Sequence, residues 1–149
     1  MKIEHILVGT DLSPEGLDCC APVADLARLV GARITLIHVV PTMSAIPHGA
    51  PLAPPVDEPG VADDVDAARA SMEGHRDAFG AGLDLTPVVV TGRDVTDGIV
   101  EYAKDNGVDL IAVATHGHTG FRHLVLGSVA EGVVRRSHVP VLVMPRQKD

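Results

Sequence analysis

The sequence predicts an α/β protein of one domain, built on an open, doubly wound parallel sheet of five strands. Five strand-like runs alternate with four helical patterns along the chain. The strand runs are apolar throughout rather than alternating, which is typical of parallel strands covered by helices on both faces. A chain of 149 residues fits a single domain, 1–149, that can bury a two-sided core.

The five predicted strands are short and rich in β-branched and aliphatic residues. They are His5 to Thr10, Arg33 to Val40, Leu85 to Thr91, Asp109 to Ala114 and Val139 to Met144. In a doubly wound sheet, ligands bind outside the carboxyl ends of the strands, where the strand order reverses. If the order is 3-2-1-4-5, that crevice lies between the first and fourth strands.

The helical patterns are bounded by residues that start and stop helices. Ser13 offers an N-cap with Pro14 at the first helical position, and Gly31 stops this first helix. Asp94 can cap the third helix, which Gly107 closes. The second helix carries the stripe Val61, Val65, Ala68, Met72 and Phe79, and the fourth runs from near Ser128 to about Arg136.

A proline-rich segment, 41–60, separates the second strand from the second helix. It holds six prolines between Pro41 and Pro59, too many for a regular element. Its small side chains give it little means to pack. We expect a mobile loop near the mouth of the crevice, able to close over a bound ligand.

Composition excludes several classes of function. The net charge is −8, with 20 acidic against 12 basic residues, which argues against a nucleic-acid surface. No apolar run is long enough to span a bilayer, and the N-terminus lacks the apolar core of a signal peptide. A cytoplasmic protein with no membrane or nucleic-acid partner is therefore expected. The two cysteines, Cys19 and Cys20, are adjacent, and adjacent residues rarely reach disulfide geometry.

The most informative motif runs from Ala114 to Gly117 and, after nine residues, continues at Gly127 and Ser128. It begins where the fourth strand ends and stops where the last helix begins. The first N–H groups of a helix have no internal partner, and glycines let a phosphate approach the backbone. The motif matches neither a Walker A sequence nor the dinucleotide fingerprint. A phosphate site and a plain strand-to-helix connection are both open on spacing alone.

An acidic loop faces this glycine loop across the predicted crevice. It runs from Gly9 through Thr10 and Asp11 to Ser13. A carboxylate at the end of the first strand can accept hydrogen bonds from ribose hydroxyls or hold a metal near phosphates. The alternative is that Asp11 caps or turns the chain before the first helix, as Asp commonly does.

These residues together resemble the universal stress protein A (UspA) family, over essentially the whole chain. The resemblance rests on the opening run 5–13, on 36–40 at the end of the second strand, and on 126–131 through 140–143. The ATP-binding branch of that family carries Gly-x-x-Gly, nine residues, then Gly-Ser or Gly-Thr. Gly117, Gly127 and Ser128 match this pattern, whereas Ala114 stands where the family has glycine.

The resemblance implies a flavodoxin-like, or Rossmann-like, sheet of order 3-2-1-4-5, a homodimer, and bound ATP or another adenine nucleotide with Mg²⁺. Asp11 would contact the nucleoside, and backbone at Val39 would meet the adenine. The implied nucleotide-binding residues are Gly9, Thr10, Asp11, Val39, Ala114, Gly117, His118, Gly127, Ser128 and Val129. If position 114 needs a positive φ, alanine would be strained by about 1 kcal/mol; at a plain strand end it costs little. The homodimer would form through the last strand, an apolar edge that needs covering.

Other uses of these residues are weaker. His116, His118 and His123 could form a zinc site, but no Cys or carboxylate lies near them, and no metal site is predicted. His38 is interpreted as a hydrogen-bonded core residue. No lysine and no Ser-His-Asp order accompanies the loop, so no catalytic residues are assigned. Three functions compete: an ATP-binding regulatory module of the stress response, a slow nucleotide hydrolase, and a dimeric interaction protein without nucleotide.

Overall fold

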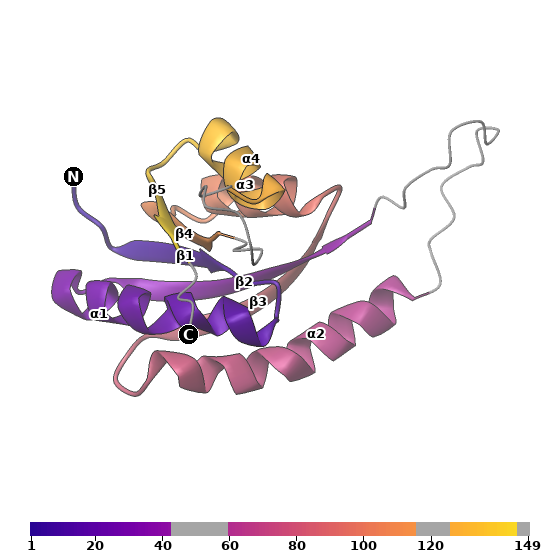
Figure 1. Cartoon of the computed structure of the whole chain (residues 1–149), viewed down its shortest axis with the longest axis horizontal. Coiled ribbons are helices and arrows are strands. Elements are labelled where there is room, and N and C mark those ends of the chain that lie inside the picture. Colours follow the sequence, from indigo (N-terminus) through magenta and orange to yellow (C-terminus); the bar gives the residue numbers. More distant parts are fainter. Residues whose placement is uncertain (43–59, 116–125, 146–149) are drawn as a thin grey trace, which may run out of the picture.

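The structure, a computed structural model, describes residues 1–42, 60–115 and 126–145. Strands and helices alternate along it, as the sequence predicts (Figure 1). The elements are β1 (His5–Gly9), η1 (Pro14–Cys19), α1 (Cys20–Val30), β2 (Arg33–Pro41), α2 (Val61–Arg76), η2 (Asp77–Phe79), β3 (Leu85–Gly92), α3 (Val95–Asp105), β4 (Leu110–Ala114), α4 (Ser128–Arg136) and β5 (Val141–Met144). Among the helices of these residues, none combines the length and the apolarity that crossing a membrane requires.

The five strands form one sheet in the order β3-β2-β1-β4-β5. All four strand pairs are parallel. The predicted fold class and strand order are therefore confirmed. β1 lies at the centre, and the order reverses on its two sides, because β2 is one neighbour and β4 is the other.

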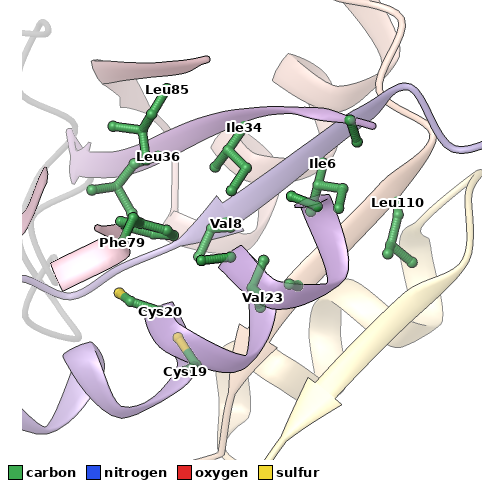
Figure 2. Close-up of a cluster of buried hydrophobic side chains, with 14 of the residues drawn as sticks. Ile6, Val8, Cys19, Cys20, Val23, Ile34, Leu36, Phe79, Leu85 and Leu110 are labelled. Atoms are coloured by element: carbon green, nitrogen blue, oxygen red, sulfur yellow. The ribbon is translucent and has the colours of Figure 1, made fainter. Parts of the chain in front are cut away.

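Each face of the sheet carries its own hydrophobic core. α1 and α2 cover one face, and α3 and α4 cover the other (Figure 1). Successive residues of β2 alternate between them, so Leu36 packs on the α1 side and Ile37 on the α3 side. Figure 2 shows the first core, where Phe79 of η2 and Val23 of α1 lie against β1 and β2. The strand runs are apolar throughout because both faces are buried.

The predicted first helix is two helices in the structure. The Ser13 hydroxyl caps its start by accepting from the Gly16 amide at 3.2 Å, as expected, but the first six residues form the 3-10 helix η1. The regular helix α1 begins only at Cys20. Pro22 explains the break, because a proline lacks the N–H that an α-helix needs beyond its first turn. Gly31 ends α1 with a φ of 72°, as predicted.

The segment 41–60 is bounded differently from the prediction. Pro41 is the last residue of β2, and Gly60 directly precedes α2. Residues 43–59 lie outside the described residues, so the expected mobile loop stays a prediction. The stripe on the second helix is confirmed for Ala68 and Met72, which are buried, while Phe79 belongs to η2.

A buried polar cluster joins the amino ends of β1, β2 and β4. His5 is only 4% exposed, and its Nε2 lies 2.8 Å from the Thr35 hydroxyl. Its Nδ1 lies 3.1 Å from an Arg33 guanidinium nitrogen, which can only donate. Nδ1 therefore accepts and Nε2–H donates, so the neutral imidazole satisfies both partners. The Asp109 carboxylate accepts from the backbone amides of Glu4 and His5.

The protein should lose stability in mild acid through His5. Burial, and next the charge of Arg33, lower the pKa of His5 below its ordinary value of 6.5. In mild acid His5 binds a proton in the unfolded chain but not in the folded chain. The contribution of neutral His5 to the free energy of unfolding is therefore lost as pH falls below about 6.5. Urea unfolding between pH 7.5 and 5 should show this loss, and a smaller one in His5→Gln. If the free energy of unfolding falls equally steeply with pH in wild type and in His5→Gln, this role of His5 is contradicted.

Candidate functional site

A pocket opens where the strand order reverses, at the carboxyl ends of β1 and β4. Its volume is about 140 Å³. Residues from β1, β2, β4, α3 and α4 and from the loop after β1 meet there, although they are far apart in the sequence. The lining residues are Gly9, Thr10, Asp11, Gly16, His38, Val39, Val95, Ile99, Val113, Ala114, Gly127, Val129 and Ala130.

Most of the residues predicted to bind nucleotide come together in this pocket. Those that line it are Gly9, Thr10, Asp11, Val39, Ala114, Gly127 and Val129. Ser128 begins α4 but is exposed and does not line the pocket. Gly117 and His118 lie outside the described residues, as do His116 and His123. The 140 Å³ enclosed by the described residues suits one ring-sized group, and is less than the 300 Å³ or more typical of a whole drug-sized ligand.

The backbone of Val39 turns one polar edge toward the pocket. The Ile37 carbonyl accepts from the Thr10 amide at 3.0 Å, so residue 37 faces β1. Because polar backbone groups alternate in direction along a strand, Val39 faces the same way, beyond the last paired residue of β1. The parallel ladder would next join the Val39 amide to the Thr10 carbonyl. No such bond forms among the described residues. One donor and one acceptor therefore point into the crevice.

The loop after β1 holds Asp11 in a turn at the edge of the pocket. The Oδ1 atom of Asp11 accepts from the Ser13 amide at 2.9 Å and from the Ser13 hydroxyl at 2.6 Å. These contacts are the predicted alternative in which Asp11 turns the chain before the first helix. The same carboxylate is exposed and lines the pocket. Leu12 follows with a φ of 63°, a backbone conformation rare for leucine. The turn role is therefore confirmed, and the ligand role stays a prediction that the position of Asp11 at the pocket leaves open.

His38 is a pocket residue that the sequence interpretation missed. It is hydrogen-bonded, as predicted, through Nδ1 to the Thr10 carbonyl at 2.9 Å. It is half-buried at the pocket wall, however, rather than in either core. Its place on an apolar strand indicated burial. The pocket opens beside it only because β1 ends opposite Ile37, one residue earlier in the register.

The floor of the pocket is apolar, and α3 supplies part of it. Val95 and Ile99 project from α3 beside Val39 and Val113. Helical spacing puts Val95 and Ile99 on one face of α3, but nothing in the sequence distinguishes a pocket wall from core. α3 approaches β2 closely at Gly98, where an added Cβ would stand 2.6 Å from a Val39 methyl group.

Ala114 stands in an ordinary strand position. It is the last residue of β4 and pairs with Met144 of β5. Among the described residues, the only non-glycine with a positive φ is Leu12. The strain considered for alanine at this position is therefore absent, and its methyl group is simply part of the pocket wall.

The first turn of α4 borders the pocket on the side of the glycine loop. Gly127 is the N-cap, and its carbonyl accepts from the Glu131 amide at 2.9 Å. The N–H groups of the three residues between them have no partner within the helix. Val129 and Ala130 of this turn line the pocket. Donors and the positive end of the helix dipole therefore lie at one end of the apolar floor.

Comparison with known proteins places this chain in a family. The sequence profile of the universal stress protein family matches residues 2–145. A universal stress protein from Methanocaldococcus jannaschii is 38% identical over 68 residues, which are 46% of this chain and 41% of that relative. The match thus spans less than half of the relative's length.

Two solved structures share the fold over their whole lengths. A universal stress protein in complex with cAMP superposes with a TM-score of 0.66 at 22% identity, covering 99% of this chain and 100% of the other. The universal stress protein of Archaeoglobus fulgidus in complex with dAMP gives a TM-score of 0.64 at 18% identity, covering 96% and 98%. With a profile match from residue 2 to residue 145, the chain belongs to the universal stress protein family.

Proposed function

We propose that this protein is a regulatory module that binds an adenine nucleotide, ATP with Mg²⁺ or a close relative, at the pocket between β1 and β4. The open backbone edge of Val39 carries the proposal. Adenine presents an acceptor, N1, beside a donor, the N6 amino group. The Val39 N–H and C=O form the complementary pair, and the flat base fills an apolar space between α3 and β4.

The ribose and the phosphates would contact the loop after β1 and the first turn of α4. Asp11 would accept from ribose hydroxyls, with Gly9 and Thr10 shaping its loop and Ala114 beside the sugar. Phosphates would meet the backbone donors of Gly127, Ser128 and Val129. Gly117 and His118 would contribute from the glycine loop. The described lining residues include no lysine or arginine. Magnesium and the helix dipole would therefore balance the phosphate charge.

Hydrolysis of a bound ATP would be slow at most. Phosphoryl transfer needs cations fixed around the transferred group and an oriented nucleophile. Within the described part of the site, Asp11 is the only charged lining residue, and it is held by Ser13. Such a site binds and releases its ligand, which suits a module that senses nucleotide in a stress response.

The nucleotide complexes of two structural neighbours support an adenine ligand. One neighbour holds cAMP and the other dAMP. Calorimetric titration with ATP, AMP and cAMP, each with and without Mg²⁺, tests the proposal and ranks the ligands. Binding of at least one is expected, and phosphate release from ATP should stay far below the roughly 1–100 turnovers per second typical of kinases. If none binds at millimolar concentration, the interaction-protein alternative replaces this function.

A homodimer through β5 is the second part of the proposal, because the two sheet edges differ. At the two ends of β3, the carbonyls of Asp84 and Gly92 accept from amides on the β2 side, those of Ile34 and Thr42, so even-numbered residues of β3 face inward. The nitrogen of Pro87 therefore lies on the outer edge and offers no donor there. At the two ends of β5, the carbonyls of Pro140 and Met144 accept from amides on the β4 side, those of Ile111 and Thr115. Val141 and Val143 thus turn their N–H and C=O groups outward, ready to pair with a second copy.

Replacing Val143 with proline should convert a dimer into a monomer. Proline fits an edge position but removes one of the two outward donors of β5. Val89→Pro is the matched control, because Val89 occupies the corresponding outward register on β3 and should leave the dimer intact. Light scattering coupled to gel filtration at micromolar concentration measures both. A monomeric wild type, or a dimeric Val143→Pro, would contradict pairing through β5. The cytoplasmic location stays a prediction from the sequence.

A further inference from the structure

Two side-chain hydrogen bonds stand where the β1·β2 ladder would otherwise continue. The register puts the next two ladder bonds at Val39, with its amide donating to the Thr10 carbonyl and its carbonyl accepting from the Leu12 amide. In the structure the Thr10 carbonyl instead accepts from Nδ1 of His38 at 2.9 Å. The Leu12 amide instead donates to the Thr10 hydroxyl at 3.0 Å.

The chemistry of the His38 contact is unambiguous. A carbonyl oxygen only accepts, so Nδ1 of His38 carries the proton and donates. The imidazole thereby donates to one lone pair of the carbonyl oxygen that the Val39 amide would otherwise use. The Thr10 hydroxyl likewise occupies the Leu12 donor, and Leu12 takes its φ of 63° in the same turn. These two contacts steer the chain away from β2 one residue after β1 ends.

Open space borders part of this turn on the side of α2, although Leu12 packs on the first core. A second hollow of about 350 Å³ opens beneath it toward α2. Asp11, Leu12 and His38 line the hollow together with Asp64 and Ser71 of α2. α2 therefore does not fill the space beside the turn, and the two hydrogen bonds hold its backbone there. Val39 is only 2% exposed, so an amide left without a partner there carries a free-energy cost that a ligand can relieve.

We infer that His38, with the Thr10 hydroxyl, is a positioning residue that ends the β1·β2 ladder and so keeps the backbone edge of Val39 open for the base. The inference rests on the proposed function for its consequence, because an open edge matters only if a ligand uses it. The open edge itself is a property of the ligand-free protein. It can therefore be tested without nucleotide.

The ligand-free test is amide hydrogen exchange at Val39. In His38→Leu the Thr10 carbonyl is released, the ladder can close, and exchange at Val39 should slow about tenfold, the effect of gaining one hydrogen bond. In His38→Asn the amide nitrogen replaces Nδ1, so exchange should stay near the wild-type rate. Thr10→Val releases the Leu12 amide and should also slow amide exchange at Val39. It replaces His38→Leu in this test if that variant folds poorly.

His75→Leu is the matched control for loss of an imidazole. Its Nδ1 also lies 2.9 Å from a backbone carbonyl, that of Ser71, but it lines neither hollow. Exchange at Val39 should not change in this variant. Unchanged or faster exchange at Val39 in both His38→Leu and Thr10→Val would overturn the inference, whatever the protein binds.

The nucleotide arm separates this inference from the proposed function. If wild type binds ATP, His38→Leu should weaken the affinity about tenfold, while His38→Asn and His75→Leu should bind within about threefold of wild type. Equal affinity in His38→Leu and wild type would overturn the role in binding. If wild type binds no nucleotide while Val39 exchange still slows in His38→Leu, the proposed function fails and the ladder-ending role stands.

Discussion

Replacing Gly98 with alanine should destabilise the protein by about 1–3 kcal/mol, the usual cost of overpacking a core. For a domain of this size that lowers the melting temperature by roughly 3–10 °C. The added Cβ would lie 2.6 and 2.8 Å from the two methyl groups of Val39, so α3 must move away from β2. Because Val39 and Ile99 line the pocket on either side of this contact, nucleotide affinity should fall as well.

Gly74→Ala is the matched control, because it makes the same change in another helix. Nothing lies within 4 Å of a Cβ added at Gly74 in α2. Alanine should therefore stabilise that helix by about 0.5–1 kcal/mol through its higher helix propensity. Thermal and urea unfolding of both variants measure the difference. If Gly98→Ala is as stable as Gly74→Ala, α3 does not press on Val39 and the described pocket wall is wrong.

Saturating ATP with Mg²⁺ should raise the melting temperature by roughly 5–10 °C. At a hundred times its dissociation constant, a ligand stabilises the folded state by about 2.7 kcal/mol. Gly117→Val should abolish the increase, because a branched side chain would stand where the family resemblance puts phosphate. The temperature of half-unfolding, measured with and without nucleotide, gives both results. An equal increase in Gly117→Val would exclude the glycine loop from the site.

Ala114→Gly probes the one departure from the glycine pattern. The structure gives alanine there an ordinary strand conformation, so the variant should bind nucleotide as tightly as wild type or slightly tighter. If wild type shows no increase in melting temperature and Ala114→Gly does, the methyl group closes the site in the natural sequence. The interaction-protein alternative would then apply to this chain.

The architecture could be predicted because each element carries a local signal. Apolar runs between helical patterns indicated parallel strands, and Ser13, Gly31 and Asp94 cap or end helices where expected. The carboxyl ends of β1 and β4 then defined the pocket. The break between η1 and α1 was missed because Pro22 acts through a missing hydrogen bond inside a pattern that otherwise reads as one helix.

The pocket walls could be predicted only in part, because they depend on register and packing between distant elements. Whether Ala114 is strained depends on a backbone angle, and a sequence shows residue types rather than angles. The sequence indicates a core position for His38, and only the register of β1 and β2 shows that β1 stops beside it. The close approach of Gly98 to Val39 joins residues of α3 and β2, and neither helix nor strand periodicity signals it.

Amide exchange at Val39, compared with Val40, tests the central claim most directly. The Val39 amide faces the pocket, whereas the Val40 amide faces β3, where the two strands pair along their length. On saturation with ATP and Mg²⁺, exchange at Val39 should slow about tenfold or more, as expected for one new hydrogen bond, while Val40 stays unchanged. If nucleotide binds and Val39 exchanges at its ligand-free rate, the base does not use this edge, and the proposed site is contradicted.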